Sequence, residues 1–373
     1  MTDMAIEAAR SPRSAPTSVG ADAVTATLGV AVVGGVYADG WAHVNVGGLE
    51  TFFTPWHLVL YSSFTVLSLW VAALVWHRRS RGTSPTSLAP PGYGLGLIGI
   101  AAFAVGGLLD MLWHLAFGIE AGLDALVSPT HLVLLGGGAL LLSSAARSDR
   151  FRNSGGPAGW TAVISIASVA SLGSFFLSYV SVFVEPGAVT ALTAIPEGAP
   201  GHQAAELPST AGLGGYLITT MVLVVPLLLI CRLGGTRPGT TTVLTAAVAL
   251  PGAALTDFRY IWPAVASVVA ALLLDLGFRA WRWPSRTIAI SVPPAILGAQ
   301  LVGLASTGDL AWPVSLWTGV IALAAMMGYA LSLLSSTLDK QEPLSRAEPH
   351  DHAIEARNRN GIAHDHSRRA ARQ

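Results

Sequence analysis

The chain has 373 residues, of which 52% are hydrophobic and 11% are charged, and its 21 basic residues balance 21 acidic ones. A soluble domain carries about 25% charged residues, so this composition, with a mean hydropathy of +0.57, excludes an ordinary soluble protein and indicates a membrane protein. The single cysteine, Cys231, excludes an intrachain disulfide and a cysteine-rich metal site. Nucleic-acid binding has no support, because the arginines flank apolar segments.

Ten apolar runs are long enough, at roughly 17–25 residues, to cross a bilayer as helices. They lie near residues 21–38, 54–77, 93–117, 128–146, 159–184, 211–231, 240–256, 260–280, 287–305 and 312–335. The predicted fold class is therefore all-α, a polytopic membrane bundle of about ten transmembrane helices. We divide it into a disordered segment at 1–20, helices 1–4 at 21–146, helices 5–10 at 147–338 and a disordered histidine-containing tail at 339–373.

The basic residues predict the orientation of this bundle. Cytoplasmic loops of membrane proteins are enriched in Lys and Arg. If the N-terminus is cytoplasmic, Arg259 is the only one of the 21 Lys and Arg residues on the outer side. We therefore expect both termini in the cytoplasm and a multi-pass protein of the cell (inner or plasma) membrane, in contact with the lipid bilayer.

Two stretches of the sequence form an internal repeat, DGWAHVNVGGLETFFTPWHLVLY from Asp39 and DMLWHLAFGIEAGLDALVSPTHLVLL from Asp110. Each contains an Asp, a His four residues later, and then Thr or Ser, Pro, one residue, His and LVL. Residues at i and i+4 share one face of a helix, and the second His falls in the opening turn of the next helix. A helical hairpin would thus bring one carboxylate and two imidazoles together near the outer membrane boundary.

Ionisable side chains are costly inside a bilayer and usually face the interior of the bundle, where they find partners. Two histidines and one carboxylate form a three-ligand set with open positions, of the kind that binds copper, zinc or non-haem iron. The predicted ligands are Asp39, His43, His57, Asp110, His114 and His131. They could form two sites of three ligands or one pooled site, and a purely structural polar network is the alternative to either.

Three acids lie in the outer loops between these ligands. Glu50 and Asp124 each precede the second His of their repeat by seven residues, and Glu120 lies nearby. Such carboxylates could hydrogen-bond the far nitrogen of a ligating imidazole. Glu50 or Asp124 could also relay protons to a redox-active metal.

The two stretches resemble the C subunit of the particulate methane and ammonia monooxygenases. That subunit has a membrane site built from Asp-x3-His followed by an FTPSH-like segment, and ETFFTPWHLVLY and LVSPTHLVLL look like this segment. The resemblance implies that the metal is copper and that the chemistry is dioxygen activation on a small apolar or weakly polar substrate. Because the family works as a three-subunit complex, it also implies partner subunits, with a homo-oligomer as the alternative.

Several other functions remain open. The same ligands would suit a copper or zinc transport or delivery protein, a haem protein with His43/His57 or His114/His131 as axial pairs, or a non-catalytic protein. The sequence contains no HExxH motif of a zinc protease, no histidine cluster of a membrane desaturase and no P-loop for a nucleotide. Lys340 is the only lysine, so no membrane lysine exists to hold retinal.

Overall fold

The computed structural model describes residues 16–46, 52–80, 89–118, 122–153, 155–281 and 283–337, and these residues form helices and connections without a strand. The helices are α1 (Val19–Asn45), α2 (Pro55–Ser80), α3 (Gly94–Phe117), α4 (Leu123–Val127), α5 (Pro129–Leu142), α6 (Ser144–Arg152), α7 (Trp160–Phe176), α8 (His202–Arg232), α9 (Thr240–Leu255), α10 (Ile261–Trp281), α11 (Ser285–Thr307) and a last helix, Val314–Thr337. Short 3-10 turns, η2 (Ser178–Val180) and η3 (Gly187–Val189), lie between α7 and α8.

The all-helical membrane bundle is confirmed in its class. Within the described residues, eight helical stretches are long and apolar enough to cross a bilayer when α5 and α6 are counted as one continuous stretch, and α7 and α9 are shorter apolar helices. The predicted run 159–184 is helical only as far as Phe176, and η2 follows at once. The tail at 339–373 and most of the segment at 1–20 lie outside the described residues.

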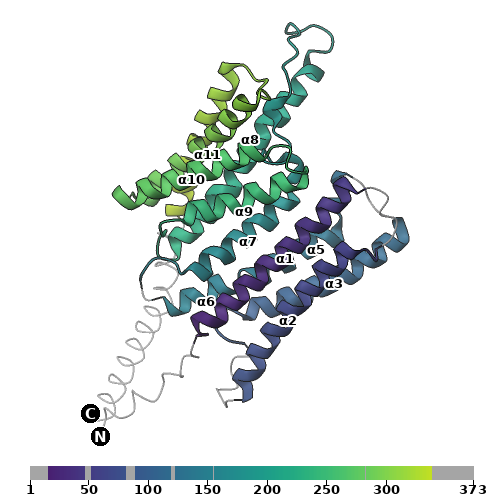
Figure 1. Ribbon diagram of the computed structural model, residues 1–373, viewed down its shortest axis with the longest axis vertical. Coiled ribbons are helices and arrows are strands. Elements are labelled where there is room, and N and C mark those ends of the chain that lie inside the picture. The colour runs from purple at the N-terminus through teal and green to yellow at the C-terminus, as the bar shows by residue number, and fades with distance from the viewer. Residues whose placement is uncertain are drawn as a thin grey trace, which may run out of the picture.

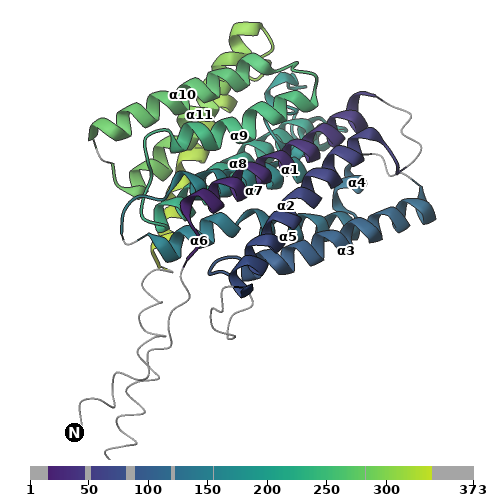
Figure 2. The ribbon, with the colours of Figure 1, turned by 60° about the horizontal axis from the view of Figure 1, so that its bottom comes forward.

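The helices divide into an N-terminal and a C-terminal group, with α7 and α9 between them (Figures 1 and 2). The N-terminal group contains α1, α2, α3 and α5, in which α1 packs on α2 and α3 packs on α5. The C-terminal group contains α8, α10 and α11. Because α7 contacts α1, α5, α8 and α9, it joins the two groups into one bundle.

Both N-terminal hairpins are held by close backbone contacts at glycine. A Cβ atom added to Gly35 of α1 would lie 2.9 Å from the Cα of Leu60 in α2. One added to Gly137 of α5 would lie 2.6 Å from the backbone nitrogen of Phe103 in α3. Small residues let membrane helices approach this closely, and the resulting van der Waals packing drives their association.

Large apolar side chains cover the outward faces of α2 and α3. Leu58, Leu69, Leu108 and Leu115 are all more than half exposed. In water such a surface would be unfavourable, but in a bilayer the acyl chains cover it while each helix satisfies its own backbone hydrogen bonds. The hairpins therefore direct their apolar residues outward, to lipid, as well as inward.

A buried polar network at the far end of the bundle fixes the start of α1. Asp22, which is fully buried, forms an ion pair with Arg152 of α6 and accepts hydrogen bonds from the hydroxyls of Thr17 and Tyr93. Arg152 also pairs with Asp149. Breaking a buried pair of this kind by removing one partner costs about 3–5 kcal/mol, so the network sets where α1 lies relative to α6.

Candidate metal centre

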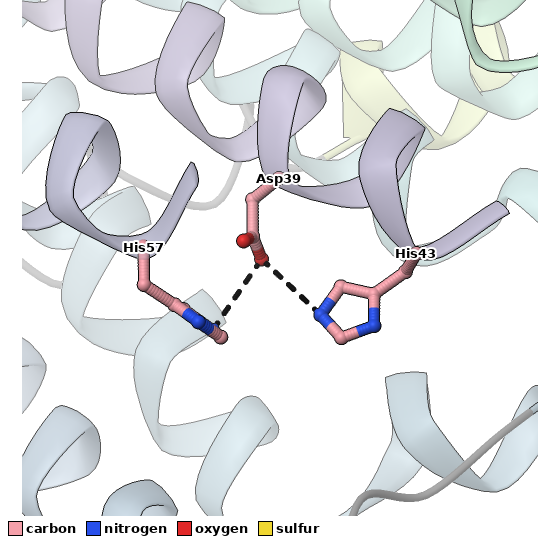
Figure 3. A group of neighbouring side chains, drawn as sticks. All are labelled: Asp39, His43 and His57. Atoms are coloured by element: carbon pink, nitrogen blue, oxygen red, sulfur yellow. Dashed lines mark ion pairs between the residues drawn. The ribbon is translucent and has the colours of Figure 1, made fainter. Parts of the chain in front are cut away.

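The first repeat folds into a closed group of one carboxylate and two imidazoles. Asp39 and His43 lie one turn apart near the end of α1, and His57 lies in the first turn of α2 (Figure 3). The Asp39 side chain points between the two rings, and its Oδ2 lies 3.8 Å from Nε2 of His43 and 3.6 Å from Nε2 of His57. The three ligand atoms lie within 4.8 Å of one another.

The second repeat builds the same group from α3 and α5. Asp110 Oδ2 lies 3.5 Å from Nε2 of His114, and its Oδ1 lies 3.5 Å from Nε2 of His131. These three ligand atoms also lie within 4.8 Å of one another. The six predicted ligands thus come together as two groups of three, which we call triad 1 (Asp39, His43, His57) and triad 2 (Asp110, His114, His131).

The spacing within each triad suits a bound metal ion. Separations of 3.5–3.8 Å between nitrogen and oxygen are at or beyond the limit of a hydrogen bond. Ligand atoms that share one ion at about 2.0–2.2 Å are held roughly 3.3–3.8 Å apart in tetrahedral or trigonal geometry. In triad 1, Asp39 Oδ1 is buried without a hydrogen-bond partner. A buried polar atom of this kind is costly unless something binds it.

Hydroxyl groups orient the second histidine of each triad. Thr54 precedes Pro55, and its Oγ1 accepts a hydrogen bond from the backbone N–H of His57 and lies 3.1 Å from the ring Nδ1. Ser128 precedes Pro129, and its Oγ lies 2.7 Å from Nδ1 of His131. Each hydroxyl caps the helix and holds the far nitrogen, so that Nε2 faces the carboxylate.

The pattern Thr/Ser-Pro-x-His contains a signal for these two hydroxyl contacts, which were not among the predicted site residues. A Thr or Ser directly before a proline is a common helix start, and its side chain reaches the residue three positions later. On the first histidine of triad 2, the far nitrogen of His114 lies 3.3 Å from the backbone carbonyl of Gly118. Two hydroxyls and one carbonyl thus lie beside the Nδ1 atoms of three of the histidines. The sequence had predicted acidic side chains at these positions.

The predicted acids contribute differently. Glu50 and Glu120 lie outside the described residues, so their predicted roles stay predictions. Asp124 is exposed on α4. Partial burial, together with the nearby carboxylates of Asp124 and Glu185, raises the pKa of the Tyr179 phenol above its usual range.

Both triads face one cavity of about 650 Å³. Phe52 lies between them, with its ring centroid 4.7 Å from that of His57 and 6.2 Å from that of His114. The rest of the lining includes Ala125 and Leu126 of α4, Leu172, Phe175 and Phe176 of α7, Tyr179 of η2, Val184 and Glu185 of the segment that follows η2, and Leu255 of α9. The segment between α7 and α8 thus helps to enclose the cavity.

Comparisons of the chain with protein-family models, with curated proteins and with solved structures found no match. The fold and the site alone define the class, a multi-pass helical membrane protein with two Asp/His groups that could hold metal ions.

Proposed function

We propose that the chain is an integral membrane copper protein of the monooxygenase or oxidoreductase type. One observation carries the proposal: each Asp-x3-His stretch and the Pro-x-His that follows it fold into a closed three-ligand group, twice in one chain. Asp39, His43 and His57 would hold one ion, and Asp110, His114 and His131 a second. The choice of copper rests on the resemblance to the C subunit of the copper membrane monooxygenases.

Copper bound at these triads would supply one-electron redox chemistry and dioxygen activation. The chain contributes the surroundings. Thr54 and Ser128 hold the orientation of the second histidine rings. Phe103 and Phe175 line the cavity beside the ligands, and Phe52 lies against the rings of His57 and His114. Glu185 lines the cavity beside Tyr179. It would exchange protons between the cavity and solvent, with Asp124, which is exposed on α4, as the second candidate.

The lining of the cavity disfavours metal transport. A transport path needs ligating groups that continue through the membrane. Deeper than the triads, the described lining residues include the apolar side chains Val36, Leu60, Phe103, Leu134 and Leu172, which offer no ligand to a metal ion. A haem between paired histidines is also disfavoured, because the carboxylates of Asp39 and Asp110 occupy the space that faces both rings.

We further propose ten membrane spans with both termini in the cytoplasm of a cell-membrane protein. The shorter helices α7 and α9 have 17 and 16 residues. At 1.5 Å per residue, such helices extend about 24–26 Å, most of the roughly 30 Å apolar layer. With ten spans, the basic residues segregate to one side. Partner subunits, or a second copy of the chain, remain part of the proposal through the family resemblance.

The test is metal content after purification from copper-supplemented membranes. We expect copper in the wild-type protein, with a paramagnetic resonance spectrum of nitrogen and oxygen ligands, and no copper in the double variant His57→Ala, His131→Ala. The variant His202→Ala is a matched control, because the His202 ring contacts the carbonyl of Ile195 away from both triads. Equal copper in wild-type and double-variant protein would overturn the assignment, and a haem absorption band would replace copper with haem.

A further inference from the structure

The cavity continues well beyond the metal ligands. Leu60 lies one turn after His57, Leu134 one turn after His131, and Phe103 seven residues before Asp110. At 1.5 Å per residue, Phe103 is roughly 10 Å further along α3 than the carboxylate. The cavity therefore has a deep apolar part, which we call the floor and which consists of Val36, Leu60, Phe103, Leu134 and Leu172.

The volume of the cavity far exceeds what metal ions or a gas molecule require. At about 650 Å³, it lies within the roughly 300–1,000 Å³ typical of pockets for drug-sized ligands. A group as large as a water molecule, such as a methylene, takes roughly 30 Å³. If a ligand fills about half of the space, it has on the order of ten non-hydrogen atoms.

The charges along the wall restrict the ligand further. Outside the triads, Glu185 is the charged side chain among the described residues that line the cavity, and none of these residues is Lys or Arg. Outside the triads, an anionic headgroup such as a phosphate would find no Lys or Arg among the described lining residues and would be repelled by Glu185. Tyr179, Ser178 and Thr256 provide uncharged polar groups near the mouth.

We propose that the cavity binds a free, uncharged aliphatic molecule of about ten carbons, with its chain on the floor and one end beside the triads. The apolar floor supplies the burial that favours such a chain, and the polar triads lie at the level that its end reaches. Calling this molecule a substrate rests on the proposed copper function, whereas its binding does not. An experiment can therefore refute the binding of this molecule without refuting the binding of copper, and the reverse.

Photolabelling of the full-length protein in lipid nanodiscs tests the binding. The probe is a ten-carbon alcohol that carries a diazirine at the end of its chain, and labelled peptides are mapped by mass spectrometry. We expect labelling of the floor segments around Phe103, Leu134 and Leu172, reduced at least fivefold by excess decan-1-ol and unchanged by ethanol. Labelling of the lipid-facing side of α3 at Leu108, which is 56% exposed, should not respond to either alcohol.

Two substitutions fill the cavity without removing a metal ligand. Leu172→Trp places an indole ring in the floor, and Ala125→Trp places one on the side of the cavity formed by α4. Each should reduce at least fivefold the labelling that decan-1-ol competes for. Leu108→Trp, on the lipid face, is the matched control and should label as the wild type does. Copper content is measured in the same preparations and should match the wild type in all three variants, which also shows that they are folded.

Each result decides one of the two proposals. Floor labelling without copper in the wild type would overturn the proposed function and leave the ligand site standing. Copper without competed floor labelling, or labelling that persists in both filled variants, would overturn the ligand site. A co-purified phospholipid that decan-1-ol displaces from the floor would show that a bilayer acyl chain is the occupant, and would overturn the proposal of a free molecule.

Discussion

The two triads have the same ligands in the same order but different surroundings. Asp110 is 1% exposed, and its two oxygens face one imidazole each. Asp39 is 15% exposed, and a single oxygen faces both imidazoles while the other has no hydrogen-bond partner. Both oxygens of Asp110 therefore have a polar neighbour in the absence of a metal, whereas Oδ1 of Asp39 has no hydrogen-bond partner.

One position accounts for much of this difference. The residue before the second histidine is Thr130 in triad 2, and its hydroxyl donates a 2.9 Å hydrogen bond to Asp110 Oδ1. The equivalent residue in triad 1 is Trp56, whose ring packs edge-on against Trp41. A tryptophan ring directed at another aromatic leaves Asp39 Oδ1 without that donor, so the repeat keeps its ligands while their support differs.

The largest expected effect is a difference in stability between the Asp110→Ala and Asp39→Ala variants, measured in metal-free protein. Asp110→Ala removes the acceptor of Thr130 and the partner of two partly buried rings, and should lower the free energy of unfolding by about 3 kcal/mol. Asp39→Ala removes a partly unsatisfied carboxylate and should change it by less than about 1 kcal/mol. Unfolding in detergent with a chelator present measures both, and an equal or larger loss for Asp39→Ala would contradict the contrast.

A smaller effect should appear when the supporting residue is changed. Thr130→Val removes the donor to Asp110 and should weaken metal binding at triad 2 by about 10- to 100-fold, the usual result of losing such a partner. Trp56→Thr supplies the missing donor and should strengthen binding at triad 1. Metal titration of each variant beside the wild type measures the shifts, and unchanged affinity in Thr130→Val would show that this hydrogen bond does not tune the site.

The smallest difference concerns the capping hydroxyls, which both triads share. Thr54→Val and Ser128→Ala each remove a helix cap and the contact to a histidine Nδ1, so each should cost about 1 kcal/mol of stability. Each should also weaken metal binding at its own triad only. Thermal unfolding and metal titration on the same samples check both effects. Loss of stability with unaltered metal affinity would show that these residues act only as helix caps.

The sequence predicted the helices well because apolar length is a strong signal in a membrane protein. All ten apolar runs contain a helix, although run 159–184 is helical only as far as Phe176, and the i, i+4 spacing and the Pro-x-His pattern predicted the six Asp and His residues that come together. The division into two groups could not be predicted, because it depends on how the hairpins pack. That packing is set by contacts such as Gly137 on Phe103 and by Phe52 between the triads.

The cavity could not be predicted from the sequence either. Its far wall comes from residues of α7, η2 and the end of α9, the first of which, Leu172, lies 41 residues along the chain from the last ligand, His131. No local pattern in Leu172, Phe175 or Leu255 distinguishes a cavity wall from an ordinary apolar helix face. The polar network at Asp22 was missed for the same reason, since Arg152 lies 130 residues away along the chain.

Metal stoichiometry in the single variants His57→Ala and His131→Ala tests the central claim most directly. Two independent triads predict two copper ions per chain in the wild type and one in each variant. The ion that remains in His57→Ala, at triad 2, should be the more tightly held. Loss of both ions from either single variant would mean that the six ligands act as one site, and unchanged stoichiometry in both variants would mean that the triads hold no metal.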